Sequence, residues 1–446
     1  MIRIAMLLVG ARALRRKWLV LAILGMVWMA LGLAIMADTT DGLSVVTVEA
    51  FAILLLIEGF GALGLFTLAP HRQGYAVLLR ALALLVLGFM ILDFPVRVDV
   101  ANSLLFGLAF LIDGAARVAT ASVVRFPKWQ LVAAGGVLEL GLAGFVLLGW
   151  PVSYHQTVPF CIGVALLLSG WTVLRIGLRL RLLTDDTPVA GLAVFEHRGW
   201  HGRGTALPPA RPAAPARHAT PLLVHVWTPV GSAEVPTPER RLLIDRYIAA
   251  IDGRGMISTG HSALELAPDL YISHYPALEL DHSPDEFAHS LRATADNDVK
   301  GLFQPSYAFE SADWCPADAN VAFHTYDAVR LRAHWDDYRA DDTYNLTDRN
   351  CSVAVAGALE AALEGTLGSG PVWARFFGLM ANPDLWVAAL LRARAESGTW
   401  TPGLVLDYAR SLHAVVEPQR SPWGRRLRVA LRRWRRRHGG MAKRPA

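Results

Sequence analysis

Cysteine is scarce in this sequence, with three residues among 446, and charged side chains make up only 18% of it. Cys161, Cys315 and Cys351 are too few and too widely spaced for a disulfide framework. None belongs to a Cys-x-x-Cys pair, the usual ligand spacing of a zinc site, so neither a metal nor an organic cofactor is expected. The low charge accompanies 53% hydrophobic residues and a mean hydropathy of +0.34. These values are high for a soluble protein and indicate a membrane-embedded part.

Long apolar runs fill the first half of the chain. Six of them are long enough to cross a bilayer, which takes about 20 residues per helix. The first has basic flanks but no small-residue cleavage site, so we interpret it as a retained helix and not as a removed signal. The sequence therefore predicts an all-α, six-helix transmembrane domain over residues 1–183, with spans near 17–37, 44–69, 75–94, 101–123, 129–150 and 157–180.

Basic residues of this half lie in alternate loops. They are Arg12, Arg15, Arg16 and Lys17; His71 and Arg72; Arg125 and Lys128; and Arg175, Arg179 and Arg181. The other loops carry aspartates, with Arg97 as the exception. Because basic loops stay on the cytoplasmic side, the pattern predicts a multi-pass membrane protein with both termini and the second half of the chain in the cytoplasm.

A short motif recurs in the second, fourth and sixth spans. It occupies Leu55–Gly59, Phe110–Gly114 and Leu166–Gly170. This repeat predicts three hairpins in which glycines allow close helix approach. Over residues 15–180 the pattern resembles the HdeD-like (DUF308) family of bacterial inner-membrane proteins. That family is named for acid resistance. The resemblance implies a location in a bacterial inner membrane and a helical membrane fold, but no defined biochemical activity.

Several ionisable residues lie within or near the spans. We interpret them as members of interhelical ion pairs, with a transport or proton-sensing role as the alternative. No pair of proline-interrupted helices indicates a transporter site, which weakens that alternative. The residues are Glu49, Glu58, Asp113 and Glu139, with Arg80 and Arg117 as candidate partners.

The second half of the chain has the composition of a soluble protein. Residues 184–220 are rich in Pro, Ala, Gly and Arg without periodicity and are interpreted as an extended linker. Residues 221–416 are expected to form one α+β domain, because strand and helix patterns are mixed with few βαβ repeats. The expected strands are 222–227, 260–266 and 271–275, with a turn at 267–269; the expected helices are 239–251, 352–364, 371–395 and 403–415.

Cys351 stands where the polar segment 344–350 meets an alanine-rich helical pattern. A thiol in the first turn of a helix lies among unpaired backbone N–H groups at the positive end of the macrodipole. Both favour the thiolate, which is the form that attacks carbonyl carbons. We therefore predict that Cys351 is a nucleophile; the alternative is a small buried core residue.

The expected base is His261, on a predicted strand and flanked by small residues. The next strand offers His274 and Ser273, and Glu265 follows on the strand of His261. One of these three would orient the imidazole, with His274 preferred and the other two as alternatives. The residues expected to line the substrate pocket or to stabilise an oxyanion are Asn350, Ser352, Ser262 and Tyr344.

Three motifs carry a second resemblance. They read Gly-His-Ser-x-Leu-Glu-Leu from Gly260, Tyr-Ile-Ser-x-Tyr-Pro from Tyr271, and Tyr-Asn-Leu-x-x-x-Asn-Cys-Ser from Tyr344. Over about residues 222–370 they are similar to circularly permuted papain-like hydrolases of the NlpC/P60 and LRAT-like group. The resemblance implies a small papain-like α+β fold in which Cys351 is the nucleophile, His261 the base and His274 the third residue.

The segment 417–446 contains eight arginines between Arg425 and Arg437. Leu427, Leu431 and Trp434 recur at helical spacing, so we predict an amphipathic helix on anionic lipid headgroups in preference to a nucleic-acid contact. The whole sequence predicts a membrane-anchored cysteine hydrolase, of peptidase or amidase type, acting on a peptide, protein or acyl-lipid substrate. One alternative is an HdeD-like sensor or scaffold without catalysis; another is an LRAT-like lipid acyltransferase.

Overall fold

A computed structural model of the chain describes residues 2–10, 18–41, 99–126, 129–150, 154–182, 215–231, 244–251, 257–278 and 289–418, with isolated positions at 53–89 and at 241. The predicted linker up to residue 214 and the predicted basic helix of the tail lie outside these residues. Contacts within the chain divide it into two units. The first consists of residues 1–29, 107–145 and 168–417, and the second of residues 30–106, 146–167 and 418–446.

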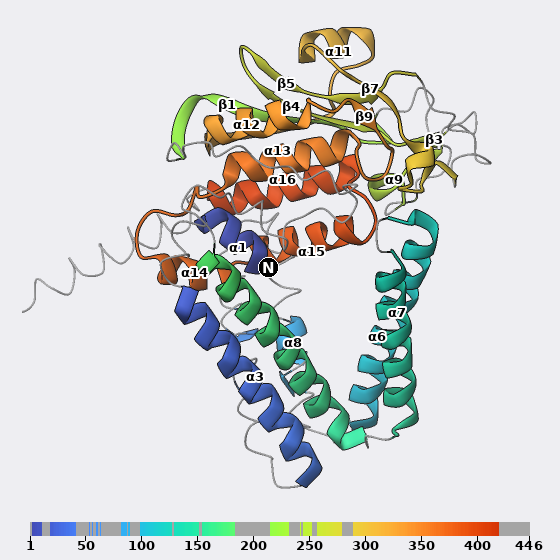
Figure 1. Cartoon of the computed structure of the whole chain (residues 1–446), viewed down its shortest axis with the longest axis vertical. Helices are drawn as coiled ribbons and strands as arrows, with labels where there is room; N and C mark the ends of the chain where they lie inside the picture. The colour runs from blue at the N-terminus through green and yellow to red at the C-terminus, as the bar shows by residue number, and fades with distance from the viewer. Residues whose placement is uncertain are drawn as a thin grey trace, which may run out of the picture. The chain divides into compact units, whose positions relative to one another are not determined.

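Four helices of the described residues are long and apolar enough to cross a membrane. They are α3 (Trp18–Asp41), α6 (Asp99–Val124), α7 (Trp129–Leu148) and α8 (Tyr154–Leu182), all labelled in Figure 1. They correspond to the first, fourth, fifth and sixth predicted spans. The predicted spans at 44–69 and 75–94 lie mostly outside the described residues, so the six-helix count stays a prediction.

Glycine pairs allow these helices to approach closely. In the first unit, a Cβ atom on Gly170 of α8 would lie 2.7 Å from the carbonyl oxygen of Gly25 in α3. In the second unit, a Cβ atom on Gly32 would lie 2.6 Å from the carbonyl oxygen of Gly163. No side chain fits at such distances, so both crossings depend on glycine.

An ion pair joins α6 to α7. The Arg117 guanidinium lies 2.8 Å from Asp113 on its own helix and 3.1 Å from Glu139 on α7. This agrees with the interpretation of Asp113 and Glu139 as members of an interhelical ion pair. Glu49, Glu58 and Arg80 lie outside the described residues.

The main sheet of the α+β part has four antiparallel strands in the order β5 (Leu270–Ile272), β4 (His261–Leu266), β1 (Ala216–Trp227) and β8 (Ala319–Tyr326). Successive residues of a strand face opposite sides. On one side Val224, Val226 and Leu264 are fully buried in the hydrophobic core. On the other side Trp227 lies opposite His261 in the ladder, which gives this face its polar and aromatic character.

Two smaller sheets complete the strands. One contains β6 (His274–Pro276), β7 (Val299–Phe303) and β9 (Thr343–Tyr344); the other pairs β2 (Ala250–Ile251) with β3 (Ile257–Ser258). The predicted strand at 271–275 is therefore divided between two sheets at Ser273. The predicted helix over 239–251 is wrong at its end: among the described residues of that range only α9 (Ile244–Tyr247) is helical, and Ala250 pairs with Ser258 in a strand.

Helices α13 (Cys351–Leu363) and α16 (Pro402–Val416) lie side by side against the core face of the sheet (Figure 1). α12 (Ala328–Tyr338) packs against α13 and begins at the N-cap Asp327. The single helix predicted over 371–395 is two helices, α14 (Val372–Met380) and α15 (Pro383–Ser397). The division occurs because Asn382 caps α15 and Pro383 fits only a first turn.

The N-terminal helix α1 (Ile2–Val9) belongs to the same hydrophobic core. Each residue from Ile4 to Val9 is at most 1% exposed, and α1 packs against α13, α14 and α15. The carbonyl oxygens of Leu7 and Leu8 accept hydrogen bonds from the N–H groups of Gly365 and Leu367, at 2.9 and 2.8 Å. The α+β part is therefore built from two segments of chain, with the membrane-capable helices between them in sequence.

Candidate active site

Cys351 is the first residue of α13, and 7% of its surface is exposed. The helix begins there because the side-chain oxygen of Asn350 accepts a hydrogen bond from the Val353 N–H at 2.8 Å. The Asn350 amide also donates to the carbonyl oxygens of Leu346 and Trp400, at 2.7 and 3.1 Å. The thiol is thus held in a fixed first turn, beside N–H groups that have no partner within the helix.

His261, the first residue of β4, lies beside this thiol. The two groups act on each other electrostatically: the thiol raises the pKa of the imidazole, and the imidazole lowers the pKa of the thiol. The ring is 3% exposed and stacks on the Tyr275 ring, with 4.1 Å between centroids, while Trp227 packs against it at 5.4 Å. The structure therefore brings together the two residues that the sequence nominated as nucleophile and base.

The other side of the imidazole faces Glu310. Nε2 of His261 lies 3.0 Å from a carboxylate oxygen of Glu310 and 2.9 Å from the hydroxyl oxygen of Ser273. Glu310 is 3% exposed and also accepts hydrogen bonds from the hydroxyls of Tyr271 and Tyr275, the latter at 2.8 Å. Since both partners occupy Nε2, Nδ1 is the nitrogen left to face the thiol. This is the relation of nucleophile, base and orienting group found in catalytic triads.

The electrostatics favour an ion pair. Burial alone lowers the pKa of His261, but Cys351 and Glu310 outweigh it and raise that pKa to about 9. Burial raises the pKa of the Cys351 thiol, but His261 and the Ser262 N–H lower it below its ordinary value. Burial also raises the pKa of Glu310, and the hydrogen bonds from His261 and the two tyrosines bring it down to about 2. A thiolate beside an imidazolium is the reactive state of cysteine nucleophiles.

His274 lies on the opposite side of its strand from Ser273. Its Nδ1 atom is 3.0 Å from the Tyr338 hydroxyl, and its ring packs edge-on against Tyr344. Burial lowers the pKa of His274 to about 3, so it is a neutral ring at physiological pH. The structure places Ser273 and Glu310 against His261, whereas His274 hydrogen-bonds Tyr338.

Glu265, the third nominated orienting residue, also has another partner. One of its carboxylate oxygens lies 3.0 Å from Nε2 of His225. It remains on the same face of β4 as His261, two positions along from Ala263.

The residues expected to line the pocket fall into two groups. Ser262 and Ser352 lie at the thiol: the Ser262 N–H helps to lower the pKa of Cys351, and the Ser352 hydroxyl is 3.7 Å from the sulfur. Tyr344 is near enough that Cys351 adds to burial in raising the pKa of its hydroxyl. Asn350, in contrast, uses its amide to hold the helix start, so its contribution is structural.

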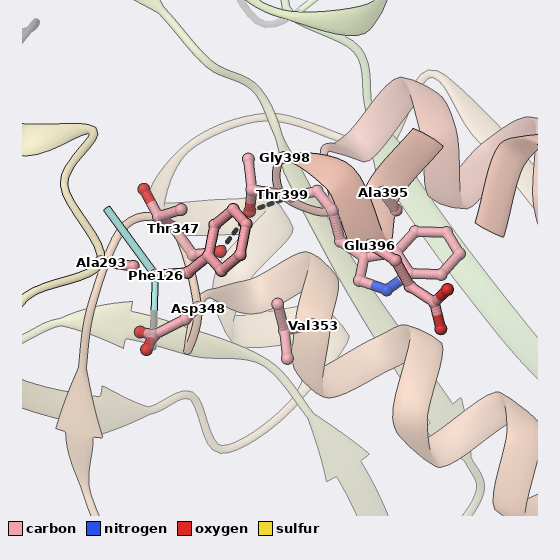
Figure 2. Close-up of a pocket in the computed structure, with 10 residues that line it drawn as sticks. Phe126, Ala293, Thr347, Asp348, Val353, Ala395, Glu396, Gly398 and Thr399 are labelled. Carbon is pink, nitrogen blue, oxygen red and sulfur yellow. Dashed lines mark hydrogen bonds between the residues drawn. The ribbon is translucent and has the colours of Figure 1, made fainter. Parts of the chain in front are cut away.

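A small pocket is lined in part by Thr347 and Asp348, which precede Cys351 in the chain (Figure 2). Its volume of about 30 Å³ suits water and not a substrate. The Thr399 hydroxyl, which receives a hydrogen bond from Asn350 at 3.2 Å, donates to the Thr347 carbonyl oxygen beside it. Neither Cys351 nor His261 lines this pocket; its walls are Phe126, Ala293, Thr347, Asp348, Val353, Ala395, Glu396, Gly398, Thr399 and Trp400.

Sequence reasoning missed Glu310. It lies on α11 (Tyr307–Asp313), in a polar and aromatic stretch for which no element was predicted. The available signal was the helix start at Ser306, whose hydroxyl accepts from the Phe309 N–H, followed by a lone glutamate among aromatic residues. Among the described residues, no group of three His, Cys, Asp or Glu side chains is arranged to hold a metal ion.

Comparison of the chain with protein-family models, curated proteins and solved structures found no match in any of the three. The functional argument therefore depends on the geometry of the site.

Proposed function

We propose that this protein is a membrane-anchored cysteine hydrolase, with Cys351 as nucleophile, His261 as acid and base, and Glu310 as the group that orients His261. The observation that carries the proposal is the buried Cys351–His261–Glu310 series, in which the thiol pKa is lowered and the histidine pKa raised. The protein would attach to a bacterial inner membrane through its apolar helices, with a papain-like domain on the cytoplasmic side. That domain and the HdeD-like membrane part remain inferences from the motifs.

The chemistry would proceed in two halves. The Cys351 thiolate attacks the carbonyl carbon of an amide or ester, and the tetrahedral intermediate expels the amine or alcohol, which takes the proton from Nδ1 of His261. This leaves a thioester on Cys351 and a neutral imidazole. A water molecule then gives a proton to His261 and adds to the thioester. Collapse releases the carboxylic acid product and restores the thiolate–imidazolium pair.

The backbone supplies the donors for the oxyanion. The N–H of Cys351 lies in the first turn of α13, where it has no acceptor within the helix, and the macrodipole adds positive potential there. Ser262 and Ser352 extend this polar surface through the 3.1 Å contact between their hydroxyls. The substrate class that fits first is a peptide or amide bond, with an acyl-lipid ester as the second.

The test uses the full chain in detergent micelles and two reagents. The rates of iodoacetamide alkylation near pH 7, measured by mass spectrometry, are compared for Cys351 and Cys315. The pKa of Cys315 is raised by burial. Cys315 is the more exposed of the two, so accessibility alone would make it react first. We expect Cys351 to react at least about tenfold faster, the factor given by one pKa unit, and to lose that advantage in His261→Ala.

Turnover of p-nitrophenyl acetate completes the test. We expect an initial burst of p-nitrophenol and no turnover above background in Cys351→Ala. Unchanged turnover in that variant rules the mechanism out. A folded wild-type protein with neither selective alkylation nor turnover would favour the alternative, a sensor or scaffold domain that binds a partner without catalysis.

A further inference from the structure

Helix α11, which carries Glu310, is too short to hold its own position. It has seven residues, and isolated helices of that length are unstable in water. Its place over the sheet must come from side-chain contacts. Tyr307, Glu310 and Trp314 follow one another at i, i+3 and i+7, so they lie along one side of the segment and face the strands.

The first of these three residues rests on a second buried histidine. The Tyr307 ring stacks on the His225 ring with 4.0 Å between centroids and 11° between planes. At the other end of the segment Trp314 stacks on Trp227, at 5.9 Å and 21°. Trp314 is 40% exposed, whereas His225 is 3% exposed, so the Tyr307 end has the firmer support.

His225 is itself held from both sides. Its Nδ1 atom lies 2.7 Å from the side-chain oxygen of Asn320, and its Nε2 atom lies 3.0 Å from Glu265. These partners belong to β8 and β4, the two neighbours of β1 in the sheet. The ring is thereby fixed in the plane against which Tyr307 packs.

A second connection leads from the same pair to Glu310. Glu265 lies opposite Tyr271 in the β4–β5 ladder, and the Tyr271 hydroxyl donates to Glu310. Glu265 therefore holds His225 on one side and lies beside a donor to Glu310 on the other. Two routes, one through Tyr307 and one through Tyr271, join His225 to the carboxylate.

We infer that His225 is a positioning residue for the hydrolase site: by holding Tyr307, it fixes α11 so that Glu310 meets Nε2 of His261. The inference rests on the proposed function, because it concerns the orienting group of that site. His225 and Glu265 thus form a second His–Glu pair, which positions the first pair, His261 and Glu310.

The experiment measures how alkylation of Cys351 by iodoacetamide depends on pH, in the full chain in micelles. The rate follows the thiolate fraction, so its midpoint reports the stability of the ion pair. We expect Glu310→Ala to raise the midpoint, because the imidazolium loses its carboxylate. His225→Ala should raise it in the same direction, lowering the rate at pH 7 by up to about tenfold, the factor given by one pKa unit.

The control is His218→Ala. His218 is another β1 histidine, near the other end of the strand, and it stacks on Tyr326 at 4.2 Å. It should leave the midpoint unchanged. Tyr307→Leu removes the same stack as His225→Ala from the other side, and it should give the same shift even if His225→Ala fails to fold.

The double variant His225→Ala/Glu310→Ala distinguishes a positioning role of His225 from a general destabilisation of the site. If His225 acts through Glu310, adding His225→Ala to Glu310→Ala should leave the midpoint where Glu310→Ala alone puts it. A further shift in the double variant, or a wild-type midpoint in both His225→Ala and Tyr307→Leu, overturns the inference while the proposed function stands. A wild-type midpoint in Glu310→Ala would instead count against the proposed site itself.

Discussion

Nε2 of His261 and a carboxylate oxygen of Glu310 are 3.0 Å apart, in a site where each residue is 3% exposed. At this depth a charged group is stable only with a partner. Glu310 has three donors, from His261, Tyr271 and Tyr275, which keep it ionised. The imidazole in turn has an acceptor that favours its protonated form. Glu310 thus fixes both the orientation and the charge of His261.

The first prediction concerns the loss of that charge. Glu310→Gln keeps the shape of the side chain but removes its negative charge, so the imidazolium and the thiolate both become less stable. General acid–base catalysis contributes about 10²–10⁴-fold, and we expect a loss of about tenfold or more in p-nitrophenyl acetate turnover at pH 7. Ser273→Ala, which removes the other Nε2 partner but no charge, should lose less. Equal losses in the two variants would contradict the assigned role of Glu310.

The second prediction concerns pH. The thiolate forms above the lowered pKa of Cys351, and the imidazolium persists up to a His261 pKa of about 9. Activity should therefore rise with pH through the lowered thiol pKa and fall again as His261 loses its proton near pH 9; both limits belong to the coupled pair. The kcat/KM profile for a p-nitroanilide checks this, because its amine leaving group must take a proton to depart. A rate that keeps rising above pH 9 would show that His261 does not supply the proton.

The sequence was informative where a signal is local. The N-cap Asn350, the small residues around His261 and the prolines at helix starts fix elements within a few residues, and β4, α13 and α16 lie close to their predicted bounds. The sequence also paired Cys351 with His261, because a helix start favours a thiolate and the earlier strand offers a histidine flanked by small residues.

Glu310 was beyond that reach. Its helix has only seven residues, too few for their spacing to predict it, and it is held by contacts to residues of β1, β4 and β5 that are distant in sequence. The choice of His274 shows a different limit. Strand alternation alone puts Tyr271, Ser273 and Tyr275 on the face of His261 and His274 on the other, whereas spacing taken from a family resemblance pointed to His274.

The third prediction tests the helix crossing in the membrane part. Gly170→Ala places a Cβ atom 2.7 Å from the Gly25 carbonyl oxygen and the Met29 amide nitrogen, so α3 and α8 must separate. Gly141→Ala is the matched control, because a Cβ atom there meets nothing within 4 Å. We expect Gly170→Ala to lower the melting temperature in micelles. Gly141→Ala should not lower it, because alanine has the higher helix propensity. Equal melting temperatures for the two variants would mean that Gly170 is not a packing position.

The fourth prediction tests whether α1 belongs to the core. Leu7 is 1% exposed among residues that pack on α13, and its carbonyl oxygen binds the Gly365 N–H. Leu7→Ala should lower the free energy of unfolding by about 2–5 kcal/mol, the range for a buried leucine. Leu278→Ala makes the same change at a position that is 81% exposed, and it should cost nothing measurable. Thermal unfolding of the full chain in micelles, followed by tryptophan fluorescence, compares them. If both variants have the melting temperature of the wild type, α1 is not a structural part of the α+β unit. If only Leu7→Ala melts early, the segment before the first span and the helix that carries Cys351 share one core.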